Sequence, residues 1–222
     1  MKVAVVIPAY NEAQTIASVI AGVRGHGLVI VVDDCSSDGT GDIAAKSGAT
    51  VVQHAANRGY DGALQSGFEK AMELGIDAVV TFDADGQHDP AVLDQFIAPL
   101  AQGEVDLVIG IRPGTARIAE ALFGLYTRLR FGVNDILCGL KAYRMTLYNA
   151  HGRFDGTRSI GTELALAGLA GGARWTTVAV PIHDRVDAPR FGSTLRANRR
   201  IFRAMLIGIG AGMFDKSSGY KQ

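Results

Sequence analysis

Two aspartates separated by one residue, Asp83 and Asp85, follow an apolar run over residues 78–82. Alternate residues of an extended strand point to the same side, so both carboxylates can reach one point beyond the strand end. Two close carboxylates repel each other unless a cation lies between them, and a hard divalent cation is the usual partner. Mg²⁺ takes one or two protein carboxylates and fills its shell with water and phosphate oxygens. The pair therefore predicts a metal with a phosphorylated ligand, and Gln87 and His88 are further candidates.

The same aspartates have a plainer interpretation as part of a loop. Asp89 followed by Pro90 has the pattern of an N-cap and a first helical residue, so the segment can simply lead into a helix. Short motifs of this kind often match by chance. The rest of the chain therefore has to decide between a metal site and a loop.

The hydrophobic pattern predicts strands that alternate with helices. Buried strands are expected at residues 2–7, 28–32, 50–53, 78–82, 106–110 and 174–181, and helices at residues 16–23, 40–47, 64–71, 92–100, 118–131 and 160–170. This alternation predicts an α/β fold with a mostly parallel central sheet and helices on both faces.

Four polar clusters follow the expected strands, at residues 8–12, 33–34, 54–62 and 83–88. In sheets of this kind, ligands bind beyond the carboxyl ends of the strands, so the four clusters should meet at one edge. A single such cluster is as easily a solvated loop. Four of them at one edge favour a binding site.

Composition narrows the class of protein. The 222 residues are 48% hydrophobic, enough for a core, and their number allows one large domain or two small ones. Basic and acidic side chains are equal in number, 22 of each, so we expect no nucleic-acid partner. Cys35 and Cys138 lie far apart without metal-ligand spacing, which fits a reduced, cytoplasmic protein. The first apolar run stops at Ile7, too short for a signal peptide. A dinucleotide-binding glycine motif and a Walker A lysine are both missing after the first strand.

Four motifs, in this order along the chain, resemble those of family 2 glycosyltransferases with the GT-A fold. They are VIPAYNE at residues 6–12, VDDCSSDGT at 32–40, NRGYDGA at 57–63 and DADGQH at 83–88. The resemblance is nearest to the dolichyl- and polyprenyl-phosphate hexosyltransferases and covers roughly residues 2–190. The ordered set is specific for the class of enzyme, but not for the sugar or the acceptor.

The resemblance implies a UDP- or GDP-linked sugar as the donor and Mg²⁺ or Mn²⁺ as the cofactor. Asp85 would hold the metal with help from Gln87, and Asp34 would accept a hydrogen bond from the base. A metal on the diphosphate neutralises the charge that develops as it leaves. The full set of residues implied for nucleotide-sugar binding is Pro8, Ala9, Tyr10, Glu12, Asp34, Gly62, Asp83 and Ala84.

The acceptor side is expected between the fifth strand and residue 195. Asp135 resembles the acceptor-side aspartate of the family and is the candidate catalytic base, although a turn or a helix cap is the alternative. Leu140 stands where the family more often has Phe. Arg112, Arg117 and Arg185 are the candidate ligands of an acceptor phosphate, because guanidinium groups fit phosphate geometry. Thr194 replaces a more common Lys, which leaves phosphate binding to the arginines.

The last residues, 196–222, read as a basic amphipathic helix and tail that follow the catalytic domain of residues 1–195. Four arginines, at positions 196, 199, 200 and 203, share one helix face, and apolar residues repeat on another face. The apolar part, residues 201–214, is about 21 Å long as a helix, too short to span a bilayer. It can lie on an anionic membrane surface through residues 196–214, or pack on the domain with a solvated basic face.

We therefore expect an inverting, metal-dependent hexosyltransferase whose acceptor is polyprenyl phosphate, in the cytoplasm or peripheral on the inner face of the membrane. One alternative is a soluble glycosyltransferase that uses a hydroxyl acceptor in polysaccharide or glycolipid synthesis. A sugar-1-phosphate nucleotidyltransferase is disfavoured, because no glycine-rich phosphate loop with Arg and Lys follows the first strand. A non-catalytic nucleotide-sugar-binding module is disfavoured because Asp85, Gln87 and Asp135 are all retained.

Overall fold

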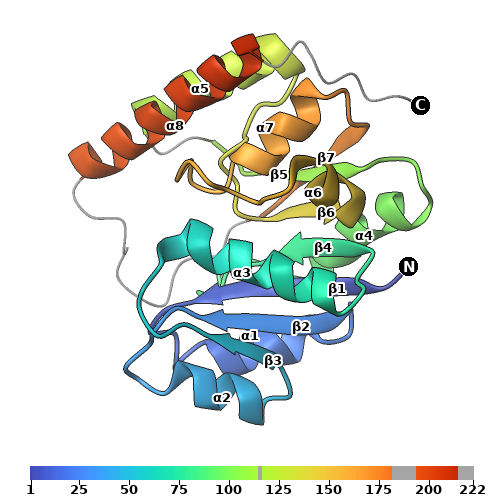
Figure 1. The fold of residues 1–222 in the computed structure, drawn as a ribbon, viewed down its shortest axis with the longest axis vertical. Helices are drawn as coiled ribbons and strands as arrows, with labels where there is room; N and C mark the ends of the chain where they lie inside the picture. The colour runs from blue at the N-terminus through green and yellow to red at the C-terminus, as the bar shows by residue number, and fades with distance from the viewer. Residues whose placement is uncertain (115–116, 182–193, 215–222) are drawn as a thin grey trace.

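The computed structural model describes residues 1–114, 117–181 and 194–214, and they form a layered α/β structure (Figure 1). The strands of the described residues are β1 (Val3–Ala9), β2 (Leu28–Asp33), β3 (Thr50–Gln53), β4 (Ala78–Thr81), β5 (Leu107–Ile111), β6 (Lys141–Arg144) and β7 (Trp175–Ala179). They lie in one sheet in the order β3-β2-β1-β4-β6-β5-β7. The expected α/β fold with a mostly parallel sheet is confirmed.

One strand runs against the others. β6 pairs antiparallel with both β4 and β5, whereas β1, β2, β3, β4, β5 and β7 pair in parallel wherever they are neighbours. Because β6 is reversed, it begins at the edge where β4 and β5 end. The segment that leads into β6, residues 134–140, therefore lies at the same edge as Asp83 and Arg112.

Helices cover both faces of the sheet (Figure 1). One face carries α1 (Ile16–Val23), α2 (Thr40–Lys46), η1 (Pro90–Val92) and α4 (Leu93–Ala101). The other carries α3 (Gly59–Glu73), α5 (Ile118–Phe131), α6 (Met145–His151), α7 (Glu163–Ala170) and α8 (Thr194–Phe214). The alternation of β1 explains the two cores, because Val5 and Ile7 face one helix layer and Ala4 and Val6 face the other.

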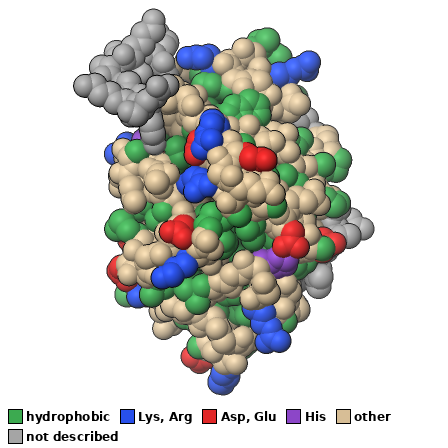
Figure 2. Space-filling model, turned by 90° about the vertical axis from the view of Figure 1, so that its right-hand side faces the viewer, with side chains coloured by type: hydrophobic (Ala, Val, Ile, Leu, Met, Phe, Trp, Pro, Cys, Tyr) green, Lys and Arg blue, Asp and Glu red, His purple; other side chains and the backbone are tan. Residues whose placement is uncertain are grey.

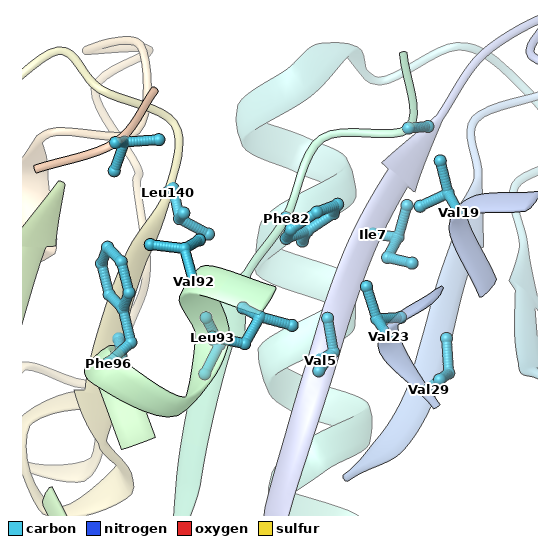
Figure 3. Close-up of a cluster of buried hydrophobic side chains, with 14 of the residues drawn as sticks. Val5, Ile7, Val19, Val23, Val29, Phe82, Val92, Leu93, Phe96 and Leu140 are labelled. Atoms are coloured by element: carbon cyan, nitrogen blue, oxygen red, sulfur yellow. The ribbon is translucent and has the colours of Figure 1, made fainter. Parts of the chain in front are cut away.

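The core on the α1 and α4 side is built from branched aliphatic and aromatic side chains. In Figure 3, Ile7 of β1 lies beside Val19 of α1, Phe82 lies in the middle of the cluster, and Phe96 lies at its other side. Each side chain of this size stabilises the fold by about 1.5–3 kcal/mol when fully buried. The strand ends that carry the polar clusters are thus fixed to a rigid base.

Three segments differ from the sequence-based expectation, and the first is α3, which begins at Gly59 and not at residue 64, so Gly59 and Gly62 lie in its first turn and not in a loop. α7 begins at Glu163 and not at residue 160, because Arg158, Ile160 and Gly161 all have positive φ and cannot continue a helix. α6 was not expected, and it starts directly where β6 ends at Arg144.

α8 spans 21 residues and packs on α5 and α7. In the part of the chain that the structure describes, no helix is both long and apolar enough to cross a membrane. On the face turned toward the right of Figure 1, basic and acidic side chains are interspersed with apolar ones (Figure 2), in keeping with the zero net charge.

Candidate functional site

The loops after β1 and β2 hold each other in place at the carboxyl edge of the sheet. The backbone N–H of Asn11 donates to Ser36 Oγ (2.9 Å), and Asn11 Oδ1 accepts from the backbone N–H of Ser37 (2.9 Å). The backbone N–H of Glu12 donates to Thr40 Oγ1 (2.8 Å). Asn11 adopts the left-handed conformation, with φ 53°, which asparagine tolerates better than most residues. The residues of this loop that are predicted to bind the sugar donor are therefore held in place by hydrogen bonds to the loop after β2.

The predicted residues of this loop differ in exposure. Tyr10 presents 43% of its surface to solvent, while Ala9 and Glu12 are buried. Pro8 and Ala9 belong to β1 and pair with Val32 and Asp33 of β2. Contacts from these two residues to a ligand would come from the strand end, and a ring surface would come from Tyr10.

Asp34 is buried and surrounded by hydrogen-bond donors from the third cluster. Oδ1 lies 2.7 Å from His54 Nδ1 and accepts from the backbone N–H of Arg58 (2.7 Å), and Oδ2 accepts from the backbone N–H of Gly59 (2.8 Å). The Nε2 atom of His54 lies 2.9 Å from Ser66 Oγ. A carboxylate offers about four lone-pair positions, so Oδ2 retains capacity for a donor from a ligand.

Asp83 joins the donor-side and acceptor-side motifs. Tyr60 donates its hydroxyl to Asp83 Oδ1 (3.3 Å), and His88 Nε2 lies 3.4 Å from Asp83 Oδ2. Burial raises the pKa of Asp83, but the hydrogen bonds and charge of His88 and the Tyr60 hydroxyl outweigh it, so the pKa is lowered. A Cβ on Gly139 would lie 2.5 Å from Asp83 Oδ2. A side chain at this position would have to displace the Asp83 carboxylate, so the segment after Asp135 lies directly against Asp83.

The metal prediction rests on Asp85 and its neighbours. Asp85 Oδ1 accepts from the backbone N–H of Gln87 (3.1 Å), which folds the Asp83–Gln87 turn around the pair. The buried Nδ1 atom of His88 has no hydrogen-bond partner among the described residues, which is unusual for a buried polar atom. No group of three or more His, Cys, Asp or Glu side chains within the described ranges could hold a metal alone. One or two carboxylates completed by phosphate oxygens are what Mg²⁺ uses, so these residues fit a metal bound together with a diphosphate.

Asp135 is bound to Arg112. Asp135 Oδ2 accepts from Arg112 Nε (2.7 Å) and Oδ1 from Arg112 Nη2 (2.9 Å), and the backbone N–H groups of Arg112 and Leu137 donate to the same carboxylate (3.2 Å each). Burial raises the pKa of Asp135, but the Arg112 hydrogen bond and charge outweigh it and hold the pKa below its usual range. The same partner raises the pKa of Arg112 despite burial. Asp135 is thus a weak proton acceptor in this state.

Lys141 was not among the predicted site residues. Its side chain is buried, and Nζ donates to the carbonyls of Cys138 (2.6 Å) and Gly161 (3.4 Å). Burial lowers its pKa, while Asp135 and Asp83 act in the opposite direction. A lysine inside an apolar strand segment was a usable sequence signal, because buried lysines are rare.

The loop between α6 and α7 forms a hydrogen bond with the start of α3, which belongs to the predicted nucleotide-sugar site. Asp155 accepts from the backbone N–H groups of Thr157, Ser159 and Gly161, and Asp61 Oδ1 accepts from the same Gly161 N–H (2.6 Å). Burial first, and then the charge of Asp155, raise the pKa of Asp61 to about 6. Gly161 therefore links Asp61, through its N–H, to Lys141, through its carbonyl.

The remaining predicted residues lie near these clusters or outside the described chain. Arg117 Nη1 donates to Glu120 (2.8 Å) at the start of α5. Gly62 lies in the first turn of α3, where a Cβ would come within 2.7 Å of Arg58 Cβ. Ala84 is buried in the core, so it can meet a ligand only through its backbone. Arg185 lies outside the described residues.

Tyr60 and His54 were also missing from the predicted set. Tyr60 and Asp61 belong to the NRGYDGA motif, which begins α3. The side chains of this motif that face the site could not be read from the sequence, because the position of the motif depends on the pairing of the preceding strand β3 with β2. His54 follows β3 and meets Asp34, which is twenty residues away in sequence.

Comparison with known proteins agrees with this geometry. The model of "Glycosyl transferase family 2" matches residues 4–159. An undecaprenyl-phosphate mannosyltransferase of Micrococcus luteus is 35% identical over 164 residues, covering 65% of this chain and 67% of that protein. An uncharacterized glycosyltransferase of Mycobacterium tuberculosis is 33% identical over 217 residues, covering 93% of this chain and 94% of the relative. The matches span 60–67% of the length of the first four relatives.

Solved structures show the same fold. Glucosyl-3-phosphoglycerate synthase of Mycobacterium tuberculosis, in complex with Mn²⁺ and uridine-diphosphate-glucose, superposes with a TM-score of 0.73 at 25% identity, covering 94% of this chain and 79% of that chain. The same enzyme has been solved with Mg²⁺ and uridine-diphosphate. The chain belongs to glycosyl transferase family 2, as its four motifs predicted.

Proposed function

We propose that this protein transfers a hexose, with inversion, from a UDP- or GDP-linked sugar to an acceptor in a metal-dependent reaction. The observation that carries the proposal is the contact of Gly139 with Asp83, which brings the segment after Asp135 against the first aspartate of the Asp-x-Asp motif. Donor phosphates and acceptor would then meet at one sheet edge. The complexes of the structural neighbour with a divalent metal and a uridine diphosphate support this assignment.

Asp85 would hold the Mg²⁺ or Mn²⁺ ion, with Gln87 and Asp83 beside it. The ion would supply neutralisation of the diphosphate charge. The chain's own contribution is positioning: Asp34 and Tyr10 would bind the nucleoside, and Tyr60 would orient Asp83 through the hydrogen bond of its hydroxyl. Pro8, Ala9, Glu12, Gly62 and Ala84 complete the proposed nucleotide-sugar site.

The acceptor that fits best is polyprenyl phosphate. A sugar hydroxyl must lose its proton as it attacks, and Asp135, bound to Arg112 with a lowered pKa, is a poor base for that step. A phosphate monoester is already ionised near neutral pH, with a second pKa near about 6, and needs cations in place of a base. Arg112 and Arg117, together with Arg185, are the proposed ligands of this phosphate.

The names of relatives point the same way. The Micrococcus luteus relative is an undecaprenyl-phosphate mannosyltransferase, and another, from Mycolicibacterium smegmatis, is a polyprenol monophosphomannose synthase. A lipid-phosphate acceptor would place the enzyme on the cytoplasmic side, with residues 196–214 as a peripheral membrane contact.

A second acceptor class has one specific observation in its favour. The structural neighbour is named for a small phosphorylated acceptor, phosphoglycerate. A soluble acceptor that reacts through a hydroxyl therefore remains the alternative, and it would require Asp135 to leave Arg112 during the reaction.

The direct test is nucleotide binding by thermal shift, with UDP and GDP in the presence of Mn²⁺ or Mg²⁺. A ligand at 100 times its Kd stabilises by about 2.7 kcal/mol, which at roughly 2–4 °C per kcal/mol is a shift of about 5–11 °C. Asp85→Asn should lose the metal-dependent part of the shift and the transfer activity. Asp94→Asn, at an exposed aspartate of α4, is the matched control and should keep both. A wild-type midpoint that neither nucleotide moves would refute the donor site.

A further inference from the structure

α5 and α8 lie side by side along one end of the molecule (Figure 1). Their inner faces belong to the core, where Phe123 of α5 and Ile201 and Ala204 of α8 are buried. Their outer faces carry large apolar side chains that are 40–80% exposed. These are Ile118, Leu122, Leu125 and Leu129 on α5, and Phe202 and Leu206 on α8, named here the α5–α8 surface.

The apolar side chains of α5 form a continuous stripe. They recur at i, i+4, i+7 and i+11, which places them on one helix face over roughly 16 Å. Six of the twelve large hydrophobic side chains that are exposed in the described residues lie on these two helices. Contiguous exposed apolar side chains of this kind often mark a site of interaction with a protein or a membrane.

The charged side chains that are exposed on these two helices have one sign. Arg128 and Arg130 of α5 and Arg199, Arg200 and Arg203 of α8 are exposed. The sequences of the two helices contain a single acidic residue, Glu120, which is buried and paired with Arg117. The chain as a whole is neutral, with 22 basic and 22 acidic residues, so the positive charge is concentrated at this surface.

We propose that the α5–α8 surface docks on the surface of an anionic lipid bilayer. The leucines would enter the headgroup–acyl boundary, and the arginines would meet the lipid phosphates. A second copy of the chain fits less well, because a two-fold contact would place the same cationic surface against itself. The sequence pointed only to residues 196–214, whereas the structure makes α5 the larger part of the apolar surface.

The reason for this docking rests on the proposed function, because only a lipid-phosphate acceptor would require the enzyme to work at a membrane. α5 starts at Ile118, directly after Arg117 and six residues beyond Arg112. A bilayer against this surface would hold the proposed phosphate ligands near the headgroup level. A lipid-phosphate acceptor could then present its phosphate to them without leaving the membrane.

The test is sedimentation of the full-length protein with vesicles of phosphatidylcholine, with and without phosphatidylglycerol. Wild type should bind the anionic vesicles, and the binding should weaken with salt. Leu125→Gln/Leu129→Gln should weaken binding at least tenfold. Arg199→Gln/Arg203→Gln should weaken it about fivefold per arginine, and only with the anionic lipid. Met72→Gln/Leu74→Gln, at exposed positions at the end of α3, is the control and should bind as wild type.

Two further measurements separate the explanations. Unchanged melting temperatures of the variants would show that their fold is intact. The Asp85→Asn variant, which we expect to be inactive, should bind vesicles as the wild type does. Vesicle binding is thus tested independently of the catalytic proposal. Light scattering of the free proteins reports on self-association. Wild type that ignores anionic vesicles at low salt, or a dimer that the leucine variant dissociates, would overturn the proposal.

Discussion

Replacing Asp135 by Asn separates the two ways in which this carboxylate could serve the reaction. In the structure it accepts four hydrogen bonds, three of them from Arg112, and its pKa is lowered. If it positions Arg112 for a phosphate, Asn keeps the shape and one acceptor oxygen, and we expect kcat/KM to fall by less than about tenfold. If it is a general base, the loss should be about 10²–10⁴-fold.

The structure also gives the cost in stability. Hydrogen bonds to charged groups contribute about 1.5–3 kcal/mol each, and Arg112 is 24% exposed, so water takes over part of the loss. We expect Asp135→Asn to destabilise by about 2–3 kcal/mol, or about 4–12 °C at roughly 2–4 °C per kcal/mol for a domain of this size. Activity must therefore be measured well below the melting temperature of the variant.

Asp106 provides the matched control. It forms a similar two-point pair with Arg174, through Nε (3.1 Å) and Nη2 (2.9 Å), but at the opposite end of β5. Asp106→Asn should lose some stability and leave kcat/KM unchanged. Asp135→Asn can then be compared with a variant that removes the same kind of ion pair away from the site.

The double variant Arg112→Ala/Asp135→Asn completes the cycle. Arg112→Ala should cost more than a hundredfold with a polyprenyl phosphate acceptor, and if Asp135 acts through Arg112, adding Asp135→Asn should cost little more. The assay is steady-state transfer to a short-chain polyprenyl phosphate. A thousandfold loss in Asp135→Asn, with Arg112→Ala near wild type, would refute the reasoning and favour a hydroxyl acceptor.

Two further predictions concern the donor side. Because the pKa of Asp61 is raised to about 6, the folded protein binds more protons than the unfolded chain between about pH 4 and 6, and its stability falls as the pH rises through this window. At pH 7.5, Asp61→Asn should therefore raise the free energy of unfolding by up to about 3 kcal/mol and raise the melting temperature with it. At pH 3.5, the same variant should melt at the temperature of the wild type. If the variant and the wild type melted at the same temperature at pH 7.5 as well as at pH 3.5, this prediction would be wrong. His54→Gln removes the ring that orients Asp34 and should raise the donor KM about tenfold with kcat nearly unchanged, as measured in initial-rate experiments; an unaltered KM would show that the ring is only structural.

Much of the fold could be predicted because the pattern of apolar residues is local. β3 and α5 begin and end where the sequence indicated, and β1, β2, β4 and β5 differ by one or two residues. The reversed direction of β6 could not be read in this way. It depends on pairing with β4 and β5, which are about 60 and 35 residues away in the chain.

In the candidate site, too, features that depend on local sequence could be predicted, whereas contacts between distant residues could not. The position of Asp83 and Asp85 just after β4 could be predicted, because the apolar run that precedes them is local, but β4 ends at Thr81 and their role as metal ligands stays a prediction. The bond between Arg112 and Asp135 was not, because it forms across 23 residues and exists only once β6 has paired with β5. The buried position of Lys141 likewise depends on the loop that carries Gly161.

The pairing of Arg112 with Asp135 also bears on what kind of acceptor the site can hold. Asp135 takes two of the five N–H donors of the guanidinium side chain, and the ion pair keeps that group in a fixed orientation at the end of β5. A carboxylate with its pKa lowered in this way is a poor proton acceptor, and the charge of Arg112 offsets its repulsion of an anion. The apolar stripe proposed to dock on the bilayer begins just beyond Arg117, so docking would hold Arg112 and Arg117 close to a phosphate that remains in the membrane. A small hydroxyl acceptor in solution would leave this docking without a role, whereas a lipid phosphate would need both the arginines and the membrane contact.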